Sequence, residues 1–168
     1  LAPDGQTLYL THFLQASISV IDRAARTVRA EIPIVQDANL VQFILLSPDG
    51  TRAYVPHTRS NATNPARLFD TTVFPVVSVV DTVGNQDLRS RRIAIDVAAR
   101  PAHFPFAAAL SLAGDRLYVI HAGSDDLSVF NTATGAGAGH LDVGSNPQGI
   151  ALSPDGARAC VKTNLAND

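Results

Sequence analysis

The sequence of 168 residues has no methionine or tryptophan and contains one glutamate, one lysine and one cysteine. Glu, Lys and Met are good helix formers, so their scarcity in a chain with 11 Gly and 10 Pro favours strands and turns over helices. A single cysteine, Cys160, excludes an internal disulfide bond. The longest apolar run, 104–112, is about half the length of a membrane span, so we expect none. A net charge of −2 argues against nucleic-acid binding.

A turn motif recurs four times along the chain, three times with Pro-Asp-Gly at its centre. Its glycines are Gly5, Gly50, Gly114 and Gly156, which lie 45, 64 and 42 residues apart. A period in the low forties is typical of four-stranded propeller blades. Inserted loops at about 58–75 and 84–102 account for the longer middle interval.

Short apolar or alternating segments between turn residues predict four strands, a to d, in each period. We expect strand a at 41–46, 106–111 and 148–153; strand b at 7–11, 52–56, 116–120 and 158–162; strand c at 17–22, 76–81 and 126–131; and strand d at 28–34, 93–97 and 139–143. The prediction is an all-β β-propeller of four-stranded antiparallel blades.

Residues 1–168 are expected to form a single partial propeller domain of about three and a half blades, out of a seven-bladed ring. Propellers need four to eight blades to close. The missing blades would come from the same polypeptide, which we favour because the chain begins at Leu1 rather than Met, or from a second copy.

Three sequence elements resemble the YVTN family of β-propeller repeats. They are Ser-Pro-Asp-Gly-x-x-x-Tyr-Val at 47–55, Val-Ser-Val-Val-Asp at 77–81 and the segment 143–149. The family is similar to the propellers of surface-layer proteins, lactonases and the haem d1 domain of nitrite reductase. The resemblance implies a periplasmic or extracellular protein. Where the family has Thr-Asn after Tyr-Val, this chain places histidine in three repeats.

Those histidines, His12, His57 and His121, each lie seven residues after a repeat glycine. Loops b–c and d–a of a four-stranded meander reach the same face, so the three share a face with His103. Imidazole is a common metal ligand, and the ring could hold copper or haem. We favour instead a structural role, in which each ring nitrogen bonds a loop carbonyl, and no cofactor. His140 is expected at a solvated strand edge.

Two enlarged loops supply further candidates for ligand or partner binding. Arg59, Arg67 and Phe69 lie in the first, on the face of His103. Arg91 and Arg92 lie in the second and could bind an anionic ligand or an acidic protein, although such groups are commonly solvated. The segment 135–139, the pair 125–126 and Cys160 indicate turns and packing rather than chemistry.

The sequence favours a binding or scaffold propeller that engages a partner protein or ligand through the face with the b–c and d–a loops. One alternative is a redox propeller with metal or haem on His12, His57 and His121. A second is a lactonase-like hydrolase. No Gly-x-Ser-x-Gly or His-Glu-x-x-His motif occurs. We therefore assign no catalytic residue and expect binding rather than catalysis.

Overall fold

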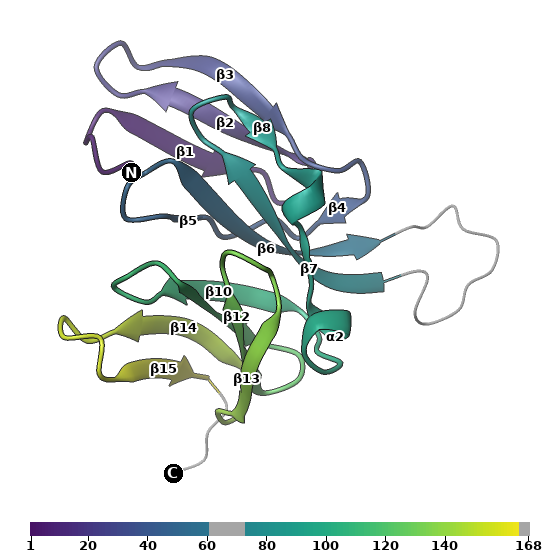
Figure 1. The fold of residues 1–168 in the computed structure, drawn as a ribbon. Helices are drawn as coiled ribbons and strands as arrows, with labels where there is room; N and C mark the ends of the chain where they lie inside the picture. The colour runs from purple at the N-terminus through teal and green to yellow at the C-terminus, as the bar shows by residue number, and fades with distance from the viewer. Residues whose placement is uncertain (61–72, 165–168) are drawn as a thin grey trace.

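The computed structural model describes residues 1–60 and 73–164, and this part of the chain forms four antiparallel sheets in sequence order (Figure 1). The first contains β1 (Thr7–Thr11), β2 (Ser17–Asp22) and β3 (Thr27–Pro33). The third contains β10 (Pro105–Leu110), β11 (Arg116–His121), β12 (Asp126–Asn131) and β13 (Gly137–Asp142). The fourth contains β14 (Pro147–Leu152) and β15 (Ala159–Thr163).

The second sheet is built around a long hairpin of β6 (Arg52–Ser60) and β7 (Val73–Asp81). The short strands β4 (Ala38–Asn39) and β5 (Leu45–Leu46) pair with β6, and β8 (Gln86–Asp87) and β9 (Ile93–Ala94) pair with β7. A 3-10 turn, η1 (Arg89–Arg91), lies between β8 and β9. A single helical turn, α2 (Ile95–Ala98), follows β9.

The all-β prediction is confirmed, and the four small antiparallel sheets are consistent with the blades of a partial propeller. β1, β2 and β12 have the expected bounds. The second sheet departs from expectation, because only Leu45 and Leu46 of strand a, predicted at 41–46, form a strand, and β4 lies before the predicted range. Strand d, predicted at 93–97, ends after Ala94 and continues as α2. In the described residues no helix is long and apolar enough to cross a membrane.

The repeated turns explain why glycine recurs at their last position. In each turn the glycine N–H donates to a carbonyl three residues earlier, for example from Gly50 to Ser47 at 2.9 Å and from Gly156 to Ser153 at 2.8 Å. The φ angles of Gly5, Gly50, Gly114 and Gly156 lie between 66° and 72°. Residues with a Cβ are strained there, whereas glycine is not.

The loops lie on two opposite sides of the molecule (Figure 1). On one side the turn before β6 bonds the turn after β7, through Thr82 N–H and the Thr51 carbonyl at 3.2 Å. On the other side the loop before β10 bonds the loop after β11, through Ala122 N–H and the Phe104 carbonyl at 2.9 Å. The second side carries the end of the β6–β7 hairpin, as the alternation of strands predicts, and we call it the hairpin face.

The core lies between successive sheets. Between the first and second sheets, Tyr9, Ile18 and Val20 pack with Val55 and Val80. A second cluster joins the second and third sheets, with Tyr54 and Val79 among its members from one side and Leu117, Val119 and Phe130 from the other. Ile150 and Val161 of the fourth sheet pack against a third cluster in the third sheet. Apolar burial at these contacts provides the main stabilisation of the fold.

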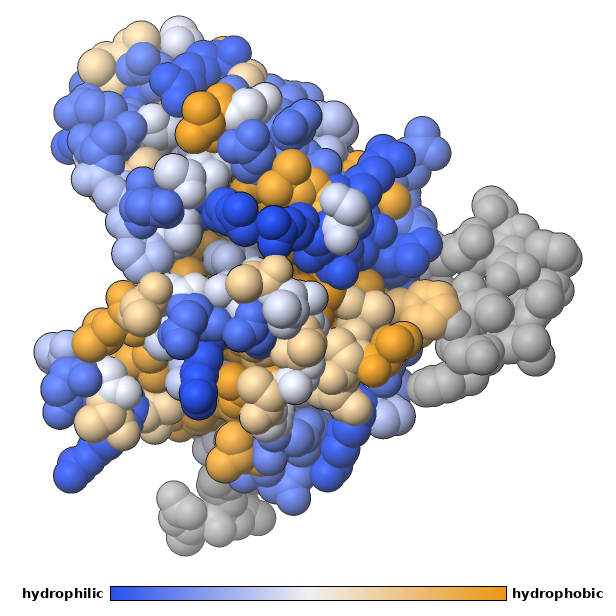
Figure 2. Space-filling model, viewed as in Figure 1, coloured by the Kyte–Doolittle hydropathy of each residue, from blue (hydrophilic) through white to orange (hydrophobic). Residues whose placement is uncertain are grey.

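One face of the first sheet has no neighbour among the described residues. Leu8 and Leu10 are 41% and 50% exposed, whereas the residues at the same repeat positions in the second sheet, Ala53 and Val55, are fully buried. The first sheet, in the upper part of Figure 2, shows a mostly hydrophilic surface in this view. The third and fourth sheets, in the lower part, show more apolar surface.

Candidate functional site

The three repeat histidines each contact a serine on the neighbouring strand of their own sheet. The distances from the histidine Nε2 to the serine Oγ are 2.8 Å for His12–Ser19, 3.0 Å for His57–Ser78 and 3.2 Å for His121–Ser128. The partner of Nε2 is thus a hydroxyl in all three, and not the loop carbonyl expected from the sequence. In two pairs the residues are seven apart, and this spacing could have revealed the contact. The inserted loop hides it in the second sheet.

His57 and His121 are completely buried. Burial lowers the pKa of His57 to about 4 and the pKa of His121 to about 3, so both rings are neutral at pH 7. His57 Nδ1 lies 3.3 Å from the Thr58 carbonyl, which can only accept. Nδ1 therefore carries the proton, and Nε2 accepts from the Ser78 hydroxyl.

No group of three or more His, Cys, Asp and Glu side chains suited to a metal ion occurs in residues 1–60 and 73–164. His12, His57 and His121 lie on three different sheets, each next to its own serine. Copper or haem binding by them stays the alternative hypothesis that the sequence raises.

A second polar cluster lies in the third sheet. His140, expected at a solvated edge, is only 16% exposed in its side chain, and its Nε2 lies 3.3 Å from Asp126 Oδ2. Asp126 is almost fully buried, and its carboxylate accepts from Ser124 Oγ at 3.1 Å. Burial raises the pKa of Asp126, and its hydrogen bond to Ser124 opposes this. The neighbouring Asp125 accepts from Asn146 N–H at 2.7 Å, which fits the structural role predicted for 125–126.

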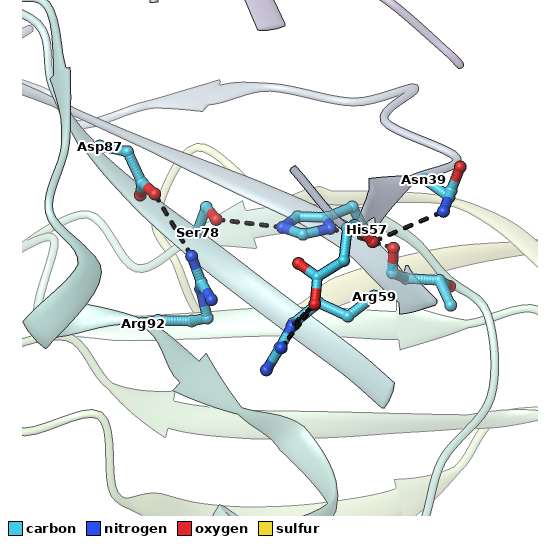
Figure 3. Close-up of polar contacts among 8 residues, drawn as sticks. Asn39, His57, Arg59, Ser78, Asp87 and Arg92 are labelled. Atoms are coloured by element: carbon cyan, nitrogen blue, oxygen red, sulfur yellow. Dashed lines mark hydrogen bonds and ion pairs between the residues drawn. The ribbon is translucent and has the colours of Figure 1, made fainter. Parts of the chain in front are cut away.

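Two ion pairs lie beside His57 (Figure 3). Arg59 on β6 donates from Nε and Nη2 to Asp37 Oδ2, at 2.7 and 2.5 Å, and its guanidinium lies 5.8 Å from the centre of the Phe74 ring. Burial acts to raise the pKa of Asp37, but the hydrogen bonds and charge of Arg59 outweigh it and lower the pKa. Arg59 is therefore held by Asp37 rather than directed at solvent.

Arg92 forms the second ion pair, with Asp87 at 3.3 Å. Both side chains are mostly buried, and burial raises the pKa of Asp87 and lowers the pKa of Arg92. Arg91 lies elsewhere and donates to the Ala133 carbonyl at 2.8 Å, in the turn after β12. Among the described candidates, Arg91 thus lies apart from Arg59 and Arg92 (Figure 3). Arg67 and Phe69 lie outside the described residues.

A pocket of about 430 Å³ opens on the hairpin face, where the second sheet meets the loop before β10. The apolar lining residues are Leu40, Val73, Pro75, Ala102 and Phe104, and the polar ones are Thr58 and His103. We call this the hairpin-face pocket. Of these residues, His103 is a candidate from the sequence, whereas Leu40, Pro75 and Phe104 are not predicted from it. Two other pockets are lined largely by the repeated turns of the opposite side and include charged residues such as Asp49.

The antiparallel sheets, and a pocket at the loop ends between two of them, define an all-β protein with propeller-like sheets. The chain is similar in structure to hydrazine synthase from Kuenenia stuttgartiensis, a protein that contains β-propeller domains. The TM-score is 0.82 at 17% sequence identity, and the match covers 99% of this chain and 58% of that one. At this identity the likeness shows the fold alone. No family model and no curated protein matches the chain, and membership of the YVTN family stays a prediction.

Proposed function

We propose that this protein is a binding module, formed by about three and a half blades of a seven-bladed propeller, that engages a ligand or partner through the hairpin face. The observation that carries the proposal is the hairpin-face pocket. Its volume lies in the range of roughly 300–1,000 Å³ that is common for ligand sites. It is also built from several loops on one side of stacked sheets, where binding residues commonly gather.

The composition of the pocket favours binding over catalysis. Among the described residues its lining has no Asp, Glu, Lys, Arg, Cys or Ser, and the polar lining groups are Thr58 and His103. Of the usual nucleophile types, this described lining offers the Thr58 hydroxyl and lacks Ser, Cys, Lys and carboxylate groups. The periplasmic or extracellular location implied by the YVTN resemblance is part of the proposal.

Replacing Val73 by Glu tests the pocket directly. Val73 is 48% exposed, so a carboxylate there can stay solvated while it places charge at the pocket wall. We expect the fold to persist. The fraction of protein that carries any species bound by the wild type should fall at least tenfold. Native mass spectrometry of the protein purified from its own source measures this, and it also detects the mass of a metal or haem.

The matched control is Val83→Glu. Val83 is 76% exposed and lies after β7, on the side opposite the hairpin face. The control should retain whatever the wild-type protein binds. Equal retention in both variants, equal loss in both, or a wild-type protein with nothing bound would contradict the proposal.

A further inference from the structure

In three successive sheets, a residue just before the predicted strand a has a left-handed backbone. These residues are Leu40, Phe104 and Asn146, each ten residues before its repeat glycine, with φ angles of 58°, 56° and 50°. The repeat therefore requires the left-handed region at this position. Asn tolerates that region, whereas Leu and Phe are strained there because of their Cβ substituents.

Asn146 shows what suits this position. Its backbone N–H donates to Asp125 Oδ1 at 2.7 Å, and its side-chain amide donates to the Ala122 carbonyl at 3.3 Å, which ties the fourth sheet to a loop of the third. Leu40 and Phe104 have no side-chain donor for such a contact. At two of three equivalent positions the chain thus carries an apolar residue that the local backbone disfavours.

Both strained residues line the hairpin-face pocket. Neither is fully buried, so their role is not limited to filling the core. Phe104 is also held by an edge-to-face contact with Phe106, with ring centres 5.7 Å apart. Strained backbone outliers cluster at ligand sites, where surrounding structure maintains them. Here the strain places two apolar side chains around one pocket.

We infer that the hairpin-face pocket binds an uncharged, apolar ring of a small molecule, and that Leu40 and Phe104 select it. This inference rests on the proposed function and names the class of ligand. In the part of the lining that the structure describes there is no Asp, Glu, Lys or Arg, so a charged ligand would lose its hydration there without gaining an ionic partner. Pro75, Val73 and Ala102 complete an apolar wall, and Thr58 and His103 supply polar atoms that orient the ligand.

The test uses two fluorescent probes with closely similar ring systems, uncharged N-phenyl-1-naphthylamine and its sulfonated counterpart 1-anilinonaphthalene-8-sulfonate. The wild-type protein should bind the uncharged probe at least tenfold more tightly. Leu40→Asn and Phe104→Asn should each weaken that binding at least tenfold. In Leu40→Asn the Tm should rise by roughly 2–4 °C because the backbone strain is relieved, whereas Phe104→Asn also loses the contact with Phe106 and should gain less. Higher stability with weaker binding is the expected signature.

Asn146→Leu is the matched control. It introduces the strained residue in the sheet that does not line the pocket, and it should lower Tm by several degrees and leave probe binding unchanged. Equal affinity for both probes, or binding of neither, overturns the inferred ligand class. A fall in Tm with unchanged binding in Leu40→Asn and Phe104→Asn shows that these residues serve packing and overturns their selecting role. The proposed function is judged separately, by the Val73→Glu comparison.

Discussion

Acidification from pH 7.5 to pH 4 is expected to remove roughly 3 kcal/mol of unfolding free energy for each of His57 and His121. Burial lowers the pKa values of these rings to about 4 and about 3. The unfolded chain therefore takes up protons near pH 6.5 that the folded chain does not. Their contribution is complete above pH 6.5 and is lost as the pH falls toward the folded values. Together the two histidine contributions are as large as the whole unfolding free energy of many domains.

Two buried carboxylates act in the opposite direction. The pKa values of Asp87 and Asp126 are raised by burial, so the folded protein retains these protons better than the unfolded chain does. Stability is gained as the pH falls through their folded pKa values, which reduces the net loss at the acid end. The slope of stability against pH is the sum of these opposite contributions, and substitution of the histidines isolates the histidine part.

Guanidinium unfolding at several pH values measures this slope. Between pH 6.5 and 5, His57→Asn and His121→Asn should each reduce the slope by about 1 kcal/mol per pH unit, and the double variant should lose both contributions. The readout is the slope, because each substitution also changes stability at pH 7.5 through packing. A slope unchanged in both single variants would refute the prediction.

Replacing Gly137 by Ala should destabilise the protein by roughly 3 kcal/mol, near the upper end for overpacked sites. A Cβ on Gly137 would overlap the carbonyl oxygen of Ala98 and lie 3.0 Å from its carbonyl carbon. Both atoms belong to backbone at the end of α2, so no side-chain rotation relieves the overlap. Either β13 or α2 must move, and the contact between the second and third sheets would open. Thermal unfolding gives the size of the effect.

Gly139→Ala is the control on the same strand. A Cβ there would meet Val129 Cγ2 at 3.6 Å and Cβ at 3.7 Å, which is ordinary van der Waals contact. Alanine also restricts the unfolded chain more than glycine does, so the change should stay within about 1 kcal/mol. Equal effects at the two positions would show that the contact with Ala98 is unimportant.

The repeat pattern predicts the regular strands well and the second sheet poorly. β1, β2 and β12 have the predicted bounds, because their apolar pattern repeats between periods. Strand d of the second sheet has one neighbour, so a single ladder of hydrogen bonds supports it, and the chain turns into α2 after Ala94. Strand a was expected at 41–46, but the left-handed Leu40 ends β4, and only Leu45 and Leu46 pair with β6 again.

The candidate site was harder to predict than the fold. The sequence shows the histidine and serine positions as two separate repeated features, and only the pairing of strands b and c joins them. The pocket depends on Leu40 and Phe104, whose residue types argue against the left-handed backbone that they adopt. One signal was available in the sequence. Leu40 and Phe104 lie ten residues before their repeat glycines, as does Asn146, and Asn is a residue type that tolerates the left-handed region.

The stacking of the four described sheets also ranks how firmly each is held by the others. Within the described residues, the first sheet shares its apolar cluster with the second, and the fourth packs on the third, whereas the second and third sheets each have two neighbours. Detaching an end sheet breaks one apolar interface, and detaching an inner sheet breaks two, as in other repeat folds. Amide hydrogens of the inner sheets are therefore the most protected from exchange. The hairpin-face pocket lies beside these inner sheets, so local opening at either end of the stack leaves its walls in place.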